Sequence, residues 1–402
     1  MKKQKKIVII GAGPCGLGAA WRLTELGYKN WQIYEKNEVG GIAQTYRDEA
    51  FSWDVGAHIL YSKNNYFNNL LAKILPTYAW RAHRREAWIW KENMFMPYPF
   101  QNNIKWLNKD KLWKCIEGLI RRKKINPKNF EEWILTNFGD GIAKEFMIPY
   151  NEKVWATSPK EMSYSWIGER VPTPSVDEIL KNVILDKDDT HWGPNDMFNY
   201  PIEGIGTVWD RIWYKLPLDN IRRGDGSKAH YDYLIDTRPC SKKLKYQSTY
   251  VFGFGILGQI PDILKDKMWV YFPEKEYPFY RVAIHSNFSQ ANAGAGCYSL
   301  LVECSKPCHM IEAAQALWKI GFIKGKIVKK WQHLEKYGYP IPTIDRDQLL
   351  KKIRGDEKKG IYHRGRFGSW RYEIGNMDHS FMQGVEVINK ILKGKKETIY
   401  DS

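Results

Sequence analysis

The opening of the chain places a short apolar run directly before a glycine-rich turn and a helical pattern. Residues 6–10 include four consecutive apolar side chains, which is typical of a strand buried on both faces. Apolar positions then recur at helical spacing until Gly27, which ends the predicted helix. A second strand is predicted over residues 31–34. Strand, helix and strand in this order predict the first unit of a parallel α/β sheet.

The periodicity changes twice farther along the chain. Between residues 107 and 146 the apolar side chains keep helical spacing, and Asn126-Pro127 marks a break between two helices. Between residues 247 and 301 the pattern is that of β-strands. The tail, residues 361–391, is expected to return to the first domain and complete its cofactor site. We therefore expect structural units that are interleaved along the sequence.

The first glycine-rich turn has the spacing of a dinucleotide-binding fingerprint. Gly11, Gly13 and Gly16 follow the first strand, and Glu35 ends the second strand about twenty residues later. Gly11 permits the tight turn, Gly13 lets the backbone approach a pyrophosphate, and Gly16 lets helix and strand pack closely. The helix N-terminus then offers free N–H groups to the phosphates, and Glu35 accepts hydrogen bonds from a ribose.

A second glycine pair, Gly40-Gly41, follows the acid, and this arrangement is typical of chains that bind FAD rather than NAD. The predicted cofactor is therefore FAD. The expected fold class is α/β, with a Rossmann-like FAD-binding domain, a helical insertion domain and an antiparallel β-sheet domain. The predicted bounds are 1–78 with 215–245 and 360–402 for the FAD-binding domain, 103–188 for a helical domain that binds and gates the substrate, and 79–102 with 189–214 and 246–359 for the β-sheet domain.

Composition limits the class of ligand. The chain has 402 residues, and 62 Lys and Arg against 45 Asp and Glu give a net charge of +17. This surplus suits either phosphate-bearing ligands or a solvated, lysine-rich surface. The cations are scattered and no nucleic-acid-binding module is recognisable, so nucleic acid is not an expected partner. Aromatic residues make up 14% of the chain, which is more ring surface than a core requires and favours stacking on planar ligands.

Targeting and metal signals are weak. No run of eighteen apolar residues occurs, so membrane insertion is not expected. Glycines interrupt the apolar part of the N-terminus and no cleavage site follows, so it is not interpreted as a signal peptide. The six cysteines show no disulfide pattern and are interpreted as free thiols of a cytoplasmic protein. Cys304, Cys308 and His309 lack a second ligand pair at zinc-finger spacing, so no metal site is predicted.

Several longer segments give the chain a family resemblance. From residue 5 to residue 392 it resembles the UDP-galactopyranose mutase family, in its eukaryotic type. The segments that carry the resemblance are residues 98–103, 149–151 with 154–155, 167–171, 192–195, 269–281 and 364–376, the last of which begins RGRFGSWRYE. Blocks of this length in this order are far more specific than a glycine motif.

The resemblance implies a non-redox isomerase. Members of the family interconvert UDP-galactopyranose and UDP-galactofuranose with reduced FAD, and NADPH is the expected reductant. N5 of the reduced flavin attacks the anomeric carbon and UDP leaves; the sugar then opens, closes through its other hydroxyl and recaptures UDP. Covalent catalysis by a cofactor agrees with the sequence, in which no convincing Ser-His-Asp set or carboxylate pair is found.

The resemblance also implies a substrate site. Arg170 and Arg281 match two arginines that grip the diphosphate, and a guanidinium suits this task because it stays charged and forms paired hydrogen bonds. Tyr98 and Phe146 match a pair that stacks on uracil. The further matches are Gln101 as an amide contact, Trp155 as a wall beside the ribose, and Asn151, Asn195, Trp269, Tyr271, Tyr339 and Tyr372 around the phosphates and the sugar.

Other matches belong to the cofactor. His58 matches a histidine beside the flavin ring, on a glycine-bearing loop that moves with the redox state of the flavin. Together with Arg170 and Arg281 it forms the predicted catalytic set, in which flavin N5 is the nucleophile. Arg85 matches an arginine that contacts NADPH. The remaining matches at the flavin are Gly41, Arg366, Gly375, Asn376 and Ser380.

The chain departs from the family pattern at a few positions. Ala57 replaces a glycine before the histidine, which is expected to stiffen that loop. Phe288 replaces a tyrosine near the diphosphate and removes a hydroxyl donor. Met377 replaces a glutamine near the flavin, and Ala87 replaces a serine near the NADPH path. The segment from residue 215 to 250 is shorter than usual and is expected to lack a strand pair and a helix, which puts FAD affinity in question.

Alternative functions stay open at this stage. Tyr98, Gln101 and Phe146 favour uridine without defining the sugar, so the substrate can be UDP-galactose or another nucleotide sugar. The wider FAD-binding fold also hosts amine oxidases, so an FAD-dependent oxidoreductase is a second possibility, although it would not need paired arginines. A flavoprotein that binds a nucleotide sugar without turnover is a third. The oligomeric state is not predicted.

Overall fold

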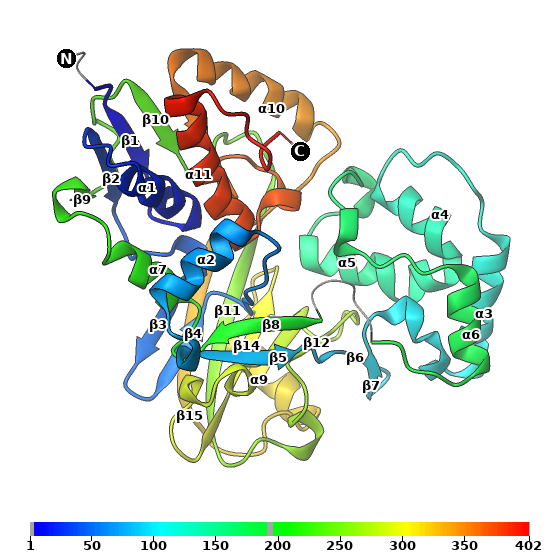
Figure 1. The fold of residues 1–402 in the computed structure, drawn as a ribbon. Helices are drawn as coiled ribbons and strands as arrows, with labels where there is room; N and C mark the ends of the chain where they lie inside the picture. Colours follow the sequence, from blue (N-terminus) through cyan, green and yellow to red (C-terminus); the bar gives the residue numbers. More distant parts are fainter. Residues whose placement is uncertain (1–3, 191–195, 402) are drawn as a thin grey trace.

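The structure is a computed structural model that describes residues 4–190 and 196–401. Three groups of elements are visible in Figure 1: a parallel sheet with its helices at the upper left, a second sheet below it, and a group of helices on the right. The upper and lower groups each combine segments that are distant in the sequence, as the changes of colour within them show, whereas α3 to α6 on the right follow one another along the chain.

The first sheet is parallel and has five strands, in the order β16-β10-β1-β2-β9. Their bounds are Ile7–Ile10 (β1), Trp31–Glu35 (β2), Ile221–Arg223 (β9), Tyr233–Asp236 (β10) and Ile361–His363 (β16). Strand β1 is buried along its whole length, which explains its continuous apolar run. Neither helix nor strand lies between β9 and β10 in residues 224–232, so this part of the sheet is joined by a short connection.

Helices pack on this sheet and on each other. They are α1 (Pro14–Glu25), α2 (Asn65–Ile74), α7 (Gly206–Trp213), α10 (Arg346–Arg354) and α11 (Met377–Lys393). The backbones of α1 and α11 approach closely at two glycines: a Cβ atom on Gly18 would lie 2.1 Å from the carbonyl oxygen of Phe381, and one on Gly384 would lie 2.0 Å from that of Cys15. Because β16 also pairs with β10, the C-terminal tail lies against the first sheet.

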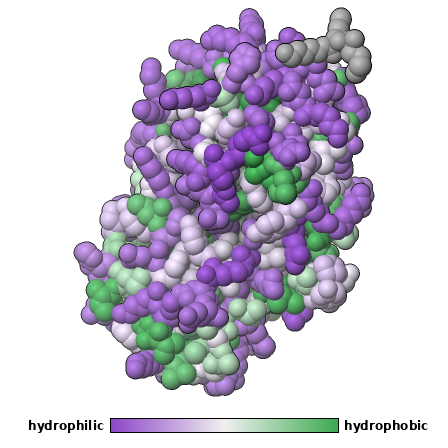
Figure 2. Space-filling view, turned by 90° about the vertical axis from the view of Figure 1, so that its left-hand side faces the viewer, coloured by the Kyte–Doolittle hydropathy of each residue, from purple (hydrophilic) through white to green (hydrophobic). Residues whose placement is uncertain are grey.

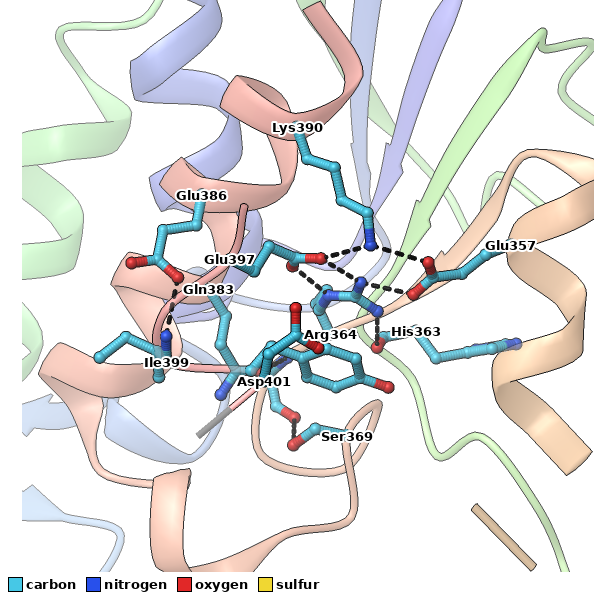
Figure 3. Close-up of polar contacts among 12 residues, drawn as sticks. Glu357, His363, Arg364, Ser369, Gln383, Glu386, Lys390, Glu397, Ile399 and Asp401 are labelled. Carbon is cyan, nitrogen blue, oxygen red and sulfur yellow. Dashed lines mark hydrogen bonds and ion pairs between the residues drawn. The ribbon is translucent and has the colours of Figure 1, made fainter. Parts of the chain in front are cut away.

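A cluster of buried charges fixes the end of the tail (Figure 3). The guanidinium of Arg364 donates from Nε to Oε1 of Glu397 at 2.6 Å and from Nη2 to Glu357 at 2.6 Å. Lys390 bridges the same two carboxylates at 2.8 Å each, and the Arg364 guanidinium lies 3.5 Å from the centre of the Tyr400 ring. The charges neutralise one another inside the fold, so the last residues of the chain are held against α11.

The second sheet has seven strands, in the order β15-β11-β14-β13-β12-β6-β7. Their bounds are Ala87–Lys91 (β6), Met94–Pro97 (β7), Tyr246–Leu257 (β11), Trp269–Tyr271 (β12), Arg281–Ile284 (β13), Cys297–Cys304 (β14) and Ile327–Pro340 (β15). All neighbouring pairs are antiparallel except β12 and β6. Helix α9 (Met310–Lys319) contributes Leu317 to a separate apolar core that includes Phe254 and Val302.

Smaller elements connect the two sheets. Strands β3 (Thr45–Asp48) and β4 (Phe51–Asp54) form a hairpin, β5 (Trp80–Arg84) pairs with β8 (Met197–Pro201), and α8 (His285–Phe288) is a single short turn. The apolar core of the first sheet continues through these elements into the helical group.

The helical group follows the predicted break. Helices α3 (Lys109–Arg121) and α4 (Phe130–Ile142) lie on either side of residues 126–127, and a π-helical turn (Ala143–Met147) joins α4 to α5 (Ile148–Trp155). Helix α6 (Val176–Ile184) completes the group. The side chains of Asn108 and Asn129 accept hydrogen bonds from the first turns of α3 and α4, which explains where these helices begin.

This architecture confirms the expected fold class, a mixed α/β fold with a parallel Rossmann-like sheet, an antiparallel sheet and a helical insertion. The face of the molecule on the side of β9 and β3 is mostly hydrophilic, with small, separate hydrophobic clusters (Figure 2). Within residues 4–190 and 196–401, no helix is both long enough and apolar enough to cross a bilayer.

Candidate active site

The three groups of elements enclose a cavity of about 1530 Å³. Most of the predicted site residues line it. These are Gly11, Gly13, Glu35, Gly41, His58, Arg85, Tyr98, Phe146, Asn151, Trp155, Arg170, Trp269, Tyr271, Arg281, Tyr339, Arg366, Tyr372, Gly375, Asn376 and Ser380. Gly16 and Gln101 do not line the cavity, and Asn195 lies outside the described residues.

The glycine turn after β1 has the shape of a phosphate cradle. Gly11 has a φ of +96°, and a Cβ atom there would lie 2.2 Å from the Thr237 hydroxyl. A Cβ atom on Gly16 would lie 1.8 Å from the carbonyl oxygen of Gly11, so this glycine is needed for packing rather than for ligand contact. At Gly13 the nearest atom to a Cβ would be Gly40 O at 3.9 Å. The backbone at Gly13 therefore leaves room for a pyrophosphate beside the N-terminus of α1.

Glu35 is held in place next to this turn. Its Oε2 accepts a hydrogen bond from Ala12 N at 2.7 Å, and its Oε1 accepts one from Asn37 N at 2.8 Å. Each carboxylate oxygen keeps a second lone pair, which can accept a hydrogen bond from a ribose hydroxyl. The turn and the acid together fit the adenosine diphosphate half of FAD.

The loop that carries His58 is anchored on both sides. Asp54, at the end of β4, is fully buried and accepts a hydrogen bond from the Tyr200 hydroxyl at 2.7 Å. Ala57 does not have a positive φ, and its N–H donates to Oε1 of Glu303 at 2.9 Å. Burial lowers the pKa of His58, so the ring is neutral at pH 7. Its Nδ1 is buried without a partner in the described part of the chain, which leaves it available to a ligand in the cavity.

Arg281 is oriented by a buried carboxylate. Its Nε and Nη2 donate to the two oxygens of Glu303 at 2.9 and 2.7 Å, and the Tyr280 hydroxyl donates to Oε2 of Glu303 at 2.7 Å. Burial disfavours both charges, but the carboxylate raises the pKa of Arg281 well above its usual value, and the guanidinium lowers the pKa of Glu303. The pair therefore stays ionised, and the outer edge of the guanidinium is free to bind an anion.

The guanidiniums of Arg170 and Arg366 also face the cavity. Arg170 donates from Nη2 to the carbonyl oxygens of residues 372–373 at 3.1 and 2.6 Å. Arg366 donates to the carbonyl oxygens of Gly338 and Gly375 at 3.0 to 3.1 Å. Neither forms an ion pair within the described residues. Burial lowers the pKa of Arg366, and the charge of Arg170 lowers it further, as expected where positive charges gather. The cavity therefore suits a ligand with at least two negative charges.

The aromatic wall differs from the predicted stacking pair. Tyr98 contacts Tyr271, with ring centres 4.9 Å apart. Phe146, in the π-helical turn, stacks on Phe100 at 4.9 Å and on Tyr150 at 5.0 Å. Of these two partners, only Tyr150 lines the cavity. A uracil can therefore stack on Phe146 only if Tyr150 moves, and the sequence analysis did not identify Tyr150 as a site residue.

Two predicted amides also have partners in the protein. Gln101 is 1% exposed and donates from Nε2 to the carbonyl oxygen of Pro172 at 2.6 Å. In this structure the Gln101 amide holds the backbone at Pro172 and does not reach the cavity, where the sequence analysis expected it to contact the ligand. Asn151 lines the cavity but uses its Nδ2 to reach Met147 O at 2.7 Å, so its Oδ1 is the atom left for a ligand.

Arg85 and Trp269 form a neighbouring part of the wall. The Arg85 guanidinium lies 5.1 Å from the centre of the Trp269 ring, within the range of a cation–π contact. The Nε1 atom of Trp269 is buried and has no acceptor in the described residues, so it can donate to a ligand.

Not all of the residues that depart from the family pattern lie at the cavity. Met377 lines the cavity, whereas Phe288 and Ala87 do not. Phe288 is fully buried, with its ring centre 5.3 Å from that of Tyr200, so its missing hydroxyl does not face this cavity. No group of three or more His, Cys, Asp or Glu side chains that could hold a metal ion occurs in the described ranges.

Strand β15 brings site residues that the sequence analysis missed. His333, Glu335 and Tyr337 line the cavity from one face of this strand. Along residues 327–337 partly buried and exposed positions alternate strictly in the structure, but the side chains at the partly buried positions are mostly polar or aromatic, so the sequence does not show the apolar alternation that predicts such a strand. Glu303 was also missed, although an acid within the apolar run of residues 300–304 is a sign of a buried, paired charge.

Comparisons with known proteins agree with this geometry. Residues 9–74 match the family model of the NAD(P)-binding Rossmann-like domain. A crystal structure of reduced UDP-galactopyranose mutase is 38% identical and covers 99% of this chain and 96% of its own, with a TM-score of 0.95. A Klebsiella pneumoniae protein described as a probable UDP-galactopyranose mutase is 23% identical over 96% of this chain and 95% of its own.

A more distant structure shares the fold alone. Cyclohexylamine oxidase from Brevibacterium oxydans is 10% identical, covers 97% of this chain and 99% of its own, and has a TM-score of 0.67. Identity and TM-score are thus much higher for the mutase structure, and its match covers 99% of this chain and therefore all three groups of elements. The chain belongs to the UDP-galactopyranose mutase family.

Proposed function

We propose that the protein is an FAD-dependent isomerase of the eukaryotic type that interconverts UDP-galactopyranose and UDP-galactofuranose without net redox change. The observation that carries the proposal is the combination, in one cavity, of a dinucleotide cradle and the guanidiniums of Arg170 and Arg366, which pair with no carboxylate of the described residues. Family membership supports the reaction, and the segments that resemble the eukaryotic type support the subclass. We also propose the three domains with the bounds expected from the sequence.

The glycine turn after β1 and Glu35 form the proposed binding site for FAD. Gly11, Gly13 and the N-terminus of α1 would hold the pyrophosphate, and Glu35 would hold the adenosine ribose. Gly41, Gly375, Asn376 and Ser380, which line the cavity, would contact the cofactor together with Arg366. Reduced FAD, when bound, would supply the nucleophile for the anomeric carbon.

The protein's own part is to bind the diphosphate, to orient the sugar and to exclude water. Arg170 and Arg281 would share the diphosphate charge, and Arg281 is already oriented by Glu303. Tyr339 and Tyr372, whose ring centres are 5.8 Å apart, would cover the phosphates and the sugar. Neutral His58 would form a hydrogen bond beside the flavin through its Nδ1, which has no partner among residues 4–190 and 196–401. The other polar contacts would come from Asn151, Asn195, Trp269 and Tyr271.

The aromatic wall of the cavity also supports proposals for where uridine and the reductant bind. Uracil would enter between Tyr98 and Phe146 after Tyr150 moves, with Trp155 beside the ribose. NADPH is the proposed reductant, with Arg85 as a contact to its phosphates. The six cysteines form no disulfide with one another, which supports a reducing compartment and thus a cytoplasmic location.

The test is anaerobic incubation of the purified protein with UDP-galactofuranose, with and without dithionite, followed by chromatography of the products. We expect UDP-galactopyranose to form only when the flavin is reduced. No conversion by a protein that holds flavin and binds UDP would reject this substrate and favour another nucleotide sugar. Oxidation of an amine with release of peroxide would favour the oxidoreductase.

A pair of arginine variants tests the assignment of the diphosphate site. Arg170→Ala should weaken UDP binding by about 10- to 100-fold, because a charge-assisted hydrogen bond contributes roughly 1.5 to 3 kcal/mol. Arg211→Ala, which removes an exposed arginine of α7 outside the cavity, is the matched control and should bind UDP normally. Equal affinity in the two variants would reject Arg170 as a diphosphate ligand.

A further inference from the structure

Positive charge is concentrated in one short segment of the helical group. Residues 109–128, which form α3 and the following connection, contain eight Lys and Arg and two acidic residues. This net charge of +6 is about a third of the +17 of the whole chain, in twenty of its 402 residues. None of these twenty residues lines the cavity, so the proposed mutase reaction does not account for them.

Large apolar side chains are exposed in the same segment. Trp113 is 60% exposed and Ile120 is 64% exposed, and their spacing of seven residues places them on one face of α3. Ile125, 48% exposed, follows in the connection. The opposite face of α3 holds Cys115 and Leu119, which are fully buried. Packing inside the fold therefore explains one face of α3 and leaves the other without a partner in the described residues.

We name this outer face the α3 surface. It consists of Trp113, Ile120 and Ile125 together with Lys109, Lys114, Arg121, Lys123, Lys124 and Lys128. In Figure 1, α3 lies at the outer edge of the helical group, on the side away from both sheets.

The charges of the α3 surface are largely unneutralised. Glu117 pairs with Arg121 at 2.8 Å, and Lys111, which is not part of the surface, pairs with Glu145 at 3.3 Å. No carboxylate of the described residues forms an ion pair with the five lysines of the surface. Their ammonium groups are therefore available to an external anion.

We propose that the α3 surface docks on an anionic lipid bilayer. A helix with apolar residues on its outer face and lysines around them lies in the plane of a membrane surface. Trp113 would sit among the headgroups, the two isoleucines would reach the acyl boundary, and the lysines would bind lipid phosphates through long, flexible side chains. This arrangement is peripheral and leaves the cavity open to substrates.

Other occupants fit the α3 surface less well. In a symmetric pair of identical chains the same patch meets itself, so a second copy would bring +6 against +6. A nucleic acid would satisfy the lysines but would leave the two isoleucines in contact with water or phosphate. An anionic bilayer satisfies the charges and the apolar side chains together.

Vesicle co-sedimentation of the full, FAD-loaded chain tests the proposal. We expect binding to vesicles of phosphatidylcholine with phosphatidylserine, no binding to pure phosphatidylcholine, and weakening by salt. Lys123→Gln with Lys124→Gln should reduce the partition constant roughly 25-fold, because each lysine contributes about fivefold. Trp113→Ser with Ile120→Ser should reduce it roughly tenfold or more.

Matched controls separate the α3 surface from general polycation binding. Lys242→Gln with Lys243→Gln removes the same charge from another exposed lysine pair, and Tyr214→Ser with Leu218→Ser removes apolar side chains that are 80% and 83% exposed. Both controls should bind vesicles as the parent chain does, and circular dichroism should show all four variants folded.

Four results would overturn the proposal. One is no binding to the acidic vesicles at low salt, and another is equal loss of binding in the Lys123/Lys124 and Lys242/Lys243 variants. The third combines two observations. Single-stranded DNA releases the protein from the vesicles at a concentration below that of the lipid, and the Trp113/Ile120 substitutions leave vesicle binding unchanged. A concentration-dependent dimer in sedimentation velocity, lost in the Trp113/Ile120 variant, would instead identify the α3 surface as an interface between copies and would also overturn it.

Discussion

Glu303 connects the loop that carries His58 to Arg281. One carboxylate oxygen accepts hydrogen bonds from both Ala57 N and the Arg281 guanidinium, and the other accepts from Arg281 and Tyr280. A ligand held by Arg281 is thereby fixed relative to the loop beside the proposed flavin site. Glu303 lines the cavity, but both of its oxygens accept hydrogen bonds from the protein, so its role is to position Arg281 and the loop that carries His58.

Glu303→Gln should loosen both ends of this connection. The substitution leaves the Arg281 charge buried without a counterion, so the free energy of unfolding should fall by about 3 to 5 kcal/mol. Hydrogen exchange at the Ala57 amide should become faster, because a neutral acceptor binds it less strongly. Glu335→Gln, at another cavity carboxylate, is the control and should change unfolding by less than about 1 kcal/mol. Unchanged exchange at Ala57 would refute the connection.

Lys153 gives the protein a distinctive pH dependence. Its Nζ donates to the carbonyl oxygens of Phe272 and Glu274 at 2.9 and 2.6 Å, which ties α5 to the chain after β12. Burial lowers the pKa of Lys153 to about 7. Above that pH the folded state releases a proton that the unfolded state keeps until about pH 10.4. The contribution of Lys153 to the free energy of unfolding therefore increases as the pH rises above 7.

The measurement is urea unfolding of the parent chain and of Lys153→Met between pH 7 and 8.5. The difference in unfolding free energy should shift in favour of the parent by about 1 kcal/mol for each pH unit. Comparing the two chains removes the common effect of buried thiols such as Cys15, whose pKa burial raises to about 12. A difference that does not change with pH would show that Lys153 keeps its proton in the fold.

At the scale of elements, local rules identified some parts of the site and missed others. The turn between β1 and α1 was predictable because its glycines are required by a φ of +96° and by a Cβ that would clash at 1.8 Å. Strand β15 was not identified, because its half-buried positions carry Trp, His, Glu and Tyr rather than aliphatic side chains. The stacking of Phe146 on Tyr150 was not predicted, because the helical spacing of residues 107–146 was interpreted as regular α-helix, whereas Phe146 lies in a π-helical turn directly before α5.

The charge cluster at the C-terminus holds the tail against α11, and its contribution to the free energy of unfolding can be measured. Ile399 lines the cavity, and the residues around it are fixed by the ion pair of Arg364 and Glu397 (Figure 3). Glu397→Gln should lower the free energy of unfolding by about 3 kcal/mol, because Arg364 is then buried with one carboxylate fewer. Limited proteolysis should also cut the tail sooner.

Glu386→Gln provides the control for this cluster. Its carboxylate accepts hydrogen bonds from Thr398 N and Ile399 N, and a glutamine oxygen can still accept them. The expected loss is about 1 kcal/mol or less. Equal losses in the two variants would mean that burial of the Glu397 charge has no special role.

At the scale of the whole molecule, the cavity depends on all three groups of elements at once. Gly13 comes from the first sheet, Tyr150 from the helical group and Tyr339 from the second sheet. The sequence predicted the fold class because fold follows from periodicity and from the fingerprint. The positions of Gln101 and Phe146 relative to the cavity follow from packing between groups, and no local pattern encodes such packing.

Removal of the cofactor should therefore affect the whole chain rather than the first sheet alone. A ligand that binds only the folded state stabilises it by about 2.7 kcal/mol at one hundred times its Kd. Calorimetry of the FAD-free chain should show one transition at a lower Tm, and added FAD should raise that transition without splitting it. UDP should raise the Tm of the FAD-loaded chain further, and Arg170→Ala should reduce this second increase. Two separate transitions, of which FAD shifts only one, would show that the groups unfold independently and that the cavity does not couple them.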